Sequence, residues 1–226
     1  MANTLLLVIL FDLLSGIIAL LVSYYAFQAR RWIENSVLSA ISFGFMLLGA
    51  ALLVEVVTTL SLGITIANAG SLRTFELLEN LAYLALQAVA LTVIAIGYAR
   101  TTYGRAAPAV ASSGLVAYAT SAAARPARLA GLALTLFYLF LGLEFVILLV
   151  LIFIMFQGYL IYSRSRDDSS LLVLLGFALI FVARLVVLRS ILDISGGEYL
   201  VAAAIQFVGF LSLLAFVIRS GRIGST

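Results

Sequence analysis

The sequence is a succession of long apolar runs, and this pattern limits the possible folds more than any other feature. A transmembrane helix needs about 20 consecutive, mostly apolar residues. Six segments meet that requirement: 4–28, 37–60, 77–99, 131–162, 170–191 and 199–218. Charged residues make up 10% of the chain, against about 25% in soluble domains, which is too few to cover a water-facing surface. We therefore predict an all-α polytopic membrane protein, placed in the plasma membrane.

The fourth of these runs is the longest. Starting near Leu129, it can continue as one helix of about 34 residues, which corresponds to about 50 Å at 1.5 Å per residue. The hydrocarbon layer is about 30 Å thick, so we expect this helix to tilt or to project from the membrane.

A seventh segment, residues 106–124, has two interpretations. It reads AAPAVASSGLVAYATSAAA, carries no charge, and has only Val110, Leu115 and Val116 as large aliphatic residues. One interpretation is an Ala/Ser-rich loop, which leaves six helices. The other is a weakly hydrophobic seventh span that neighbouring helices shield from lipid, because small residues allow close helix packing.

The placement of arginine favours seven spans. If the N-terminus is outside, seven spans put eight arginines on the inner side and four on the outer side, whereas six spans give seven and five. Positively charged residues are enriched in cytoplasmic loops, so the seven-span arrangement fits better. It predicts an N-terminus outside and a C-terminus in the cytoplasm.

The two halves of the chain share a pattern of residues. At an offset of 134, Tyr25, Arg30 and Ser36 match Tyr159, Arg164 and Ser170; a small slip then aligns Gly44-Phe45 with Gly176-Phe177. At an offset of 119, Glu79, Gln87 and Arg100 match Glu198, Gln206 and Arg219. Charges and tyrosines at helix ends also occur in unrelated helices, so the Gln and Gly-Phe pairs carry most of the weight. The pattern predicts a parallel 3+1+3 repeat: residues 1–105, a linking span 106–128, and residues 129–226.

That layout resembles the sugar-transporter and PQ-loop families, and its helix count resembles that of microbial rhodopsins. The PQ-loop families have prolines within their repeats, but the two prolines here, Pro108 and Pro126, lie in or beside the linker. The rhodopsins need a lysine for retinal, and all basic residues here are arginine. The residues therefore assign the chain to no family.

Missing residue types restrict the chemistry. The chain has no cysteine and no histidine, which removes thiol nucleophiles, thiolate metal sites and the commonest general base. We find no catalytic motif, so we predict no enzyme activity, no cofactor and no metal. The basic residues lie where loop charges are expected, so no nucleic-acid partner is predicted.

Polar residues within the spans are the candidate functional residues, because such residues are costly in a membrane. Glu144 lies near the middle of the longest run, and Arg184 is its natural partner if both lie at the same depth. Such a pair either sets the helix register or lies on a path for protons or solutes. Asp12, Glu55, Gln87 and Gln206 can face a cavity on the outer side; each alone also fits an ordinary interhelical hydrogen bond.

Three functions follow from these features. The nearly apolar spans and short loops favour a structural or accessory subunit of a larger membrane complex or a homo-oligomer. Its partners are then the lipid bilayer and other membrane subunits or copies of itself. The first alternative is a small-solute or ion transporter built on the repeat, with a polar cavity near the midplane lined by Asp12, Gln87, Glu144 and Gln206. The second is a membrane sensor module whose output is a separate protein.

Overall fold

The described residues form α-helices almost throughout, which confirms an all-helical protein. The computed structural model describes residues 2–30, 36–65, 72–103, 129–193 and 196–223. The helices are α1 (Ala2–Arg30), α2 (Ser36–Thr65), α3 (Leu72–Tyr103), α5 (Leu129–Ser165), α6 (Asp168–Asp193) and α7 (Gly196–Ile223). All six are long and apolar enough to cross a membrane. They coincide with the six predicted runs.

The long fourth run is one helix, as predicted. α5 has 37 residues and ends in a tight turn before α6. Arg166 in this turn has φ 49°, and its N–H donates to the carbonyl of Tyr162 at 2.8 Å. The carbonyl of Asp167 then accepts from the N–H of Ser170 at 3.0 Å, which starts α6. A left-handed residue after the last turn is a common helix ending, and here it turns the chain back so that α6 lies along α5.

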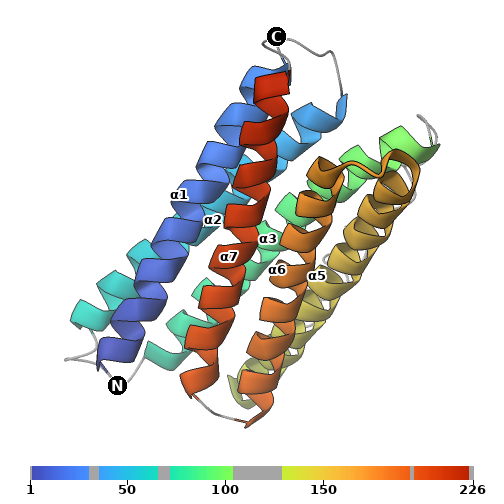
Figure 1. Cartoon of the computed structure of the whole chain (residues 1–226). Coiled ribbons are helices and arrows are strands. Elements are labelled where there is room, and N and C mark those ends of the chain that lie inside the picture. The colour runs from blue at the N-terminus through green and yellow to red at the C-terminus, as the bar shows by residue number, and fades with distance from the viewer. Residues whose placement is uncertain (1, 31–35, 66–71, 104–128, 194–195, 224–226) are drawn as a thin grey trace.

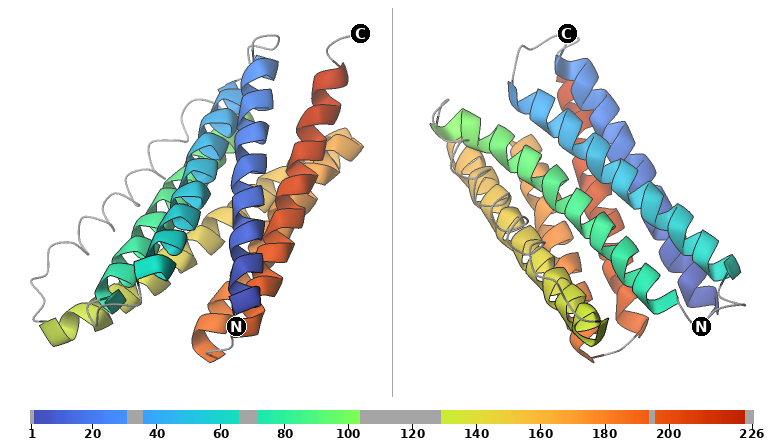
Figure 2. Two further views of the ribbon diagram at one scale, coloured as in Figure 1. Left: turned by 90° about the vertical axis from the view of Figure 1, so that its left-hand side faces the viewer. Right: turned by 180° about the vertical axis from the view of Figure 1, so that it is seen from behind.

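The six helices form a closed ring. Each helix packs on its neighbour in chain order, and α1 completes the ring by packing on α7. Figures 1 and 2 show the two sets, α1–α3 and α5–α7, side by side along their length. Every helix therefore has one face toward the interior of the ring and another toward lipid.

The helices do not simply alternate in direction along the chain. α1, α3, α5 and α7 all start at the end where the N-terminus lies, and α2 and α6 run the opposite way (Figure 1). α3 and α5 are neighbours and run in the same direction, so the last residue of α3 and the first of α5 lie at opposite ends of the bundle. The predicted seventh span at 106–124 lies outside the described residues. Seven spans and the 3+1+3 repeat therefore stay predictions.

Two close helix crossings depend on glycine. A Cβ at Gly44 in α2 would lie 2.9 Å from the carbonyl oxygen of Ala90 in α3. A Cβ at Gly176 in α6 would lie 3.0 Å from the carbonyl oxygen of Gly209 in α7. Real side chains do not approach backbone so closely, so only glycine allows these helix pairs to pack at this distance.

Aromatic side chains fill the interior where α2, α3, α6 and α7 meet. The rings of Phe45 and Phe177 have centroids 6.2 Å apart, and Phe45 and Phe210 are 6.3 Å apart. Tyr98 meets Phe177 edge-on at 6.4 Å. These separations are within the range of favourable aromatic contacts. All four residues are buried, so we call them the aromatic layer.

Candidate functional site

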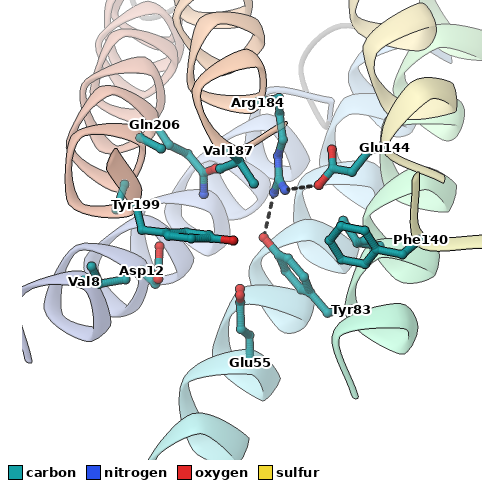
Figure 3. A pocket seen from close by; sticks show the side chains of 13 residues that line it. Val8, Asp12, Glu55, Tyr83, Phe140, Glu144, Arg184, Val187, Tyr199 and Gln206 are labelled. Atoms are coloured by element: carbon teal, nitrogen blue, oxygen red, sulfur yellow. Dashed lines mark hydrogen bonds and ion pairs between the residues drawn. The ribbon is translucent and has the colours of Figure 1, made fainter. Parts of the chain in front are cut away.

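A buried arginine is the centre of the polar interior. Arg184 in α6 is only 4% exposed. Its Nη1 donates to Oε1 of Glu144 at 3.2 Å, forming an ion pair. Its Nη2 donates to the hydroxyl of Tyr83 at 2.8 Å and also to the side-chain oxygen of Gln87. Figure 3 shows Tyr83 and Glu144 reaching the guanidinium from two different helices.

These side chains meet because they lie at the same depth. Glu144 is about six residues, or ~9 Å, past the start of the span Tyr138–Arg164. Arg184 is about as far, ~9 Å, from the end of Ser170–Ser190, which runs the opposite way. In α3, Tyr83 and Gln87 are four residues apart and share one face. Helix periodicity and antiparallel packing thus bring the polar groups to one level.

A cavity of about 150 Å³ lies beside this cluster, and all six helices contribute to it. Figure 3 shows the side chains around it. Its lining comprises Val8, Asp12, Glu55, Tyr83, Leu84, Phe140, Glu144, Arg184, Val187, Tyr199, Ala202, Ala203 and Gln206. It therefore brings together five of the six residues singled out in the sequence. The sixth, Gln87, contacts the same arginine.

Two buried polar atoms of the ion pair lack a partner among the described residues. They are Oε2 of Glu144 and Nε of Arg184. Both atoms are enclosed by protein, so neither faces the open space of the cavity. Buried polar atoms are nearly always hydrogen-bonded, and leaving one unmade costs about 1–3 kcal/mol. The side chains that border the cavity supply carboxyl, guanidinium, hydroxyl and amide groups, which suit a polar molecule.

A transporter site was predicted near the midplane, and the cavity extends toward one end of the bundle. Its deepest lining residue by position in a span, Gln206, is about eight residues, or ~12 Å, past the start of Glu198–Arg219. Asp12 is about six residues, or ~9 Å, past the start of Leu6–Arg30. The half-thickness of the hydrocarbon layer is ~15 Å. The cavity therefore lies toward the end of the bundle at which α1 begins.

The sequence did not point to the aromatic lining residues Tyr83, Tyr199 and Phe140. Tyrosines near the ends of spans usually mark the membrane interface, so Tyr83 and Tyr199 gave no separate signal. One clue was present: Tyr83 is one helical turn before Gln87 and so lies on the face that carries a polar candidate.

Charged pairs at the ends of the bundle contribute little. Arg189 and Glu198 lie 3.7 Å apart near the cavity end, and Arg219 and Asp168 lie 3.3 Å apart at the opposite end. Both arginine side chains are more than half exposed, and exposed pairs contribute about 0–1 kcal/mol. In the sequence, Glu76, Glu79, Asp193 and Glu198 form an acidic rim at the cavity end, which we predict to be solvated; of these, only the side chain of Glu198 lies in the described part of the structure.

Neither a metal site nor a similarity to known proteins indicates the function. Among the described residues, no group of three or more acidic side chains is arranged to hold a metal ion. The cluster is thus one of carboxylate, guanidinium, hydroxyl and amide groups around a small cavity. No family model, curated protein or solved structure matches this chain.

Proposed function

We propose that the protein binds a small polar solute in the cavity and carries it across the membrane. The observation that carries this proposal is the cavity itself: all six helices line it, and its lining holds carboxyl, guanidinium, hydroxyl and amide groups. Ionisable residues inside a membrane are costly and usually mark substrate or ion pathways. We place the protein in the cell membrane, with its N-terminus outside.

A parallel repeat is part of this proposal. α1 and α5, α2 and α6, and α3 and α7 run in the same directions (Figure 1). The glycine crossings also correspond: Gly44 meets Ala90 and Gly176 meets Gly209, and these positions follow the same offsets as the matching Gly-Phe and Gln pairs. Parallel repeats are a known transporter plan. A cavity between two such units is where an alternating carrier holds its solute.

The linking span belongs to the same proposal. Residues 104–128 join the end of α3 to the start of α5, and those two points lie at opposite ends of the bundle (Figure 1). A covalent connection between them has to run the length of the bundle. The absence of charge from 106 to 124 lets that connection pass through lipid. This supports a seventh span.

The aromatic layer supports access from one end at a time. Phe210 is one turn, or ~6 Å, beyond Gln206, and Phe177 is about two turns, or ~10 Å, from Arg184. Both displacements lead away from the cavity end (Figure 1). The layer of packed rings therefore stands between the cavity and the opposite end. A carrier needs such a closed side while the other side receives solute.

An accessory subunit, the role favoured by the apolar spans, stays a prediction. That role needs an outer surface for partners; it accounts for the ion pair as a device that sets helix register, but not for a polar cavity inside the ring. Burying such groups costs free energy. A solute-binding role supplies a reason for that cost. The same consideration applies to the sensor module.

Single cysteines test the proposal, because the chain has none of its own. Ala203 lines the cavity, so Ala203→Cys reports access to it. In sealed proteoliposomes of one orientation, we expect a membrane-impermeant maleimide to label Ala203→Cys when added to either side. A carrier exposes its site to both sides in turn. Ala51→Cys, buried in the apolar core, is the matched control and stays unlabelled.

Labelling of Ala203→Cys from one side only would contradict the carrier. One-sided labelling together with a partner that co-purifies in a fixed ratio would support the accessory-subunit role instead. The cysteine-free parent protein must give no labelling in the same assay.

A further inference from the structure

We propose that the cavity selects a small organic ammonium ion. The inference rests on the proposed function, because it names the solute class for the same site. The cavity volume of about 150 Å³ is close to that of a cavity known to hold benzene, so a cation of about five to eight non-hydrogen atoms fits. Charge, hydrogen-bonding capacity and aromatic lining support this class independently.

The lining carries more negative than positive charge. It contains the carboxyl groups of Asp12, Glu55 and Glu144 and a single guanidinium, that of Arg184. Carboxyl groups thus outnumber the guanidinium by three to one in this lining. Electrostatic interactions are much stronger away from bulk water. The cavity therefore attracts a cation and repels an anion.

The carboxyl groups of the lining favour a charged hydrogen-bond donor. An ammonium group offers charge-assisted N–H donors, which form stronger bonds to a carboxylate than a neutral hydroxyl does. The lining supplies carboxyl groups from three different helices. A carboxylate solute offers no donor.

Aromatic rings complete the site. Tyr83, Phe140 and Tyr199 border the cavity, and Figure 3 shows the two tyrosines converging with Asp12 and Glu55 on the same space. Ring faces attract cations, by about 0.5–2 kcal/mol depending on desolvation. No set of three acidic groups among the described residues is arranged for a metal ion. Apolar rings with separated carboxyl groups suit an organic cation better than an inorganic one.

A size-matched series of probes tests the class. The probes are isobutylammonium, isobutanol and isobutyrate, added to the purified full-length protein in detergent, with binding followed by calorimetry and by the shift in melting temperature. We expect isobutylammonium to bind and to raise the melting temperature, and the alcohol and the carboxylate to do neither. Glu144→Gln should weaken ammonium binding about tenfold or more, because it removes one of the three carboxyl charges of the lining.

Two further variants keep the test decisive if Glu144→Gln does not fold. Glu144→Gln leaves Arg184 without its counter-ion and can fail to fold, so Asp12→Asn provides a second removal of cavity charge; it should also weaken binding about tenfold. Asp168→Asn is the control: Asp168 is exposed and pairs with Arg219 at the opposite end, so binding should not change.

The outcomes separate this inference from the function it rests on. Binding of the alcohol or the carboxylate, weakened by Asp12→Asn, would overturn the ammonium class and leave a solute site in place. Ammonium binding together with one-sided labelling of Ala203→Cys would support the ammonium class and contradict the proposed carrier function. If none of the three probes binds, the ammonium class is wrong.

Discussion

Arg184 shows how a charge is tolerated among apolar helices. Its three side-chain partners lie on two other helices and satisfy both terminal nitrogens, whereas Nε has no partner among the described residues. Attraction to Glu144 offsets part of the desolvation cost, but a buried pair of this kind seldom adds net stability. The larger effect is on specificity, because removing either member leaves an isolated charge in a low-dielectric interior.

A double-variant cycle tests this at Arg184 and Glu144. We expect Arg184→Met and Glu144→Leu each to lower the free energy of unfolding by about 3–5 kcal/mol, because each leaves one group of the pair without its counterpart. The double variant should lose much less than the combined single losses. Unfolding in mixed micelles with increasing denaturing detergent measures all three.

Arg219→Met is the control for the cycle. It breaks an exposed pair with Asp168, so its effect should stay below about 1 kcal/mol. Simple additivity of the two cavity variants would contradict the coupling that the 3.2 Å contact implies.

The site could be foreseen in part from single residues. Glu144 and Arg184 stood out because a charge within an apolar run is rare, and equal depth suggested their meeting. Tyr83 could not be separated from ordinary interfacial tyrosines, since its role depends on the direction of one helix face toward Arg184. The cavity itself depends on small side chains, such as Ala202 and Ala203, whose significance appears only when six helices surround them.

At the scale of helices, apolar length determined the elements, and small residues determine how closely they pack. Length and hydropathy were enough to predict six helices, including the single long α5. They were not enough to predict which helices touch at close range. Gly44 and Gly176 control two equivalent crossings because their missing side chains face a carbonyl of the neighbouring helix.

Substitution of these glycines should show the same effect at both crossings. We expect Gly44→Ala and Gly176→Ala each to lower stability by about 1–3 kcal/mol, because the new methyl group overlaps the neighbouring helix. Gly158→Ala is the matched control: its Cβ would meet nothing nearer than Leu174 at 3.6 Å. It should be neutral or slightly stabilising, since alanine favours helix.

Thermal unfolding in detergent measures the three variants side by side. Equal tolerance of Gly44→Ala and Gly158→Ala would mean that the α2–α3 crossing adjusts freely. A loss of stability at one crossing and not at the other would weaken the case for a structural repeat.

At the scale of the whole chain, the directions of the helices say more about the topology than their number does. α3 and α5 run in the same direction, which hydropathy could not reveal; the 3+1+3 arrangement itself stays a prediction. The Ala/Ser segment at 106–124 has too few large aliphatic residues to decide its own placement. Its placement as a seventh span stays a prediction.

Accessibility labelling tests this arrangement. Ser36→Cys and Ser170→Cys, at or near the starts of α2 and α6, should react with an impermeant maleimide from the same side of sealed vesicles. If residues 106–124 form the proposed seventh span, Arg125→Cys should react from the opposite side. Opposite sides for Ser36 and Ser170 would exclude the parallel repeat, and a common side for all three would exclude the seventh span.

The position of Arg184 in the chain has a consequence for biogenesis. Tyr83 and Gln87 in α3 and Glu144 in α5 all precede it, so a nascent protein that inserts from its N-terminus places every partner before the cation arrives. An arginine at the centre of an inserting helix costs about 2.5–3.5 kcal/mol. When α6 inserts, the helices that carry these acceptor side chains are already in the bilayer. The order of translation therefore assists the insertion of α6.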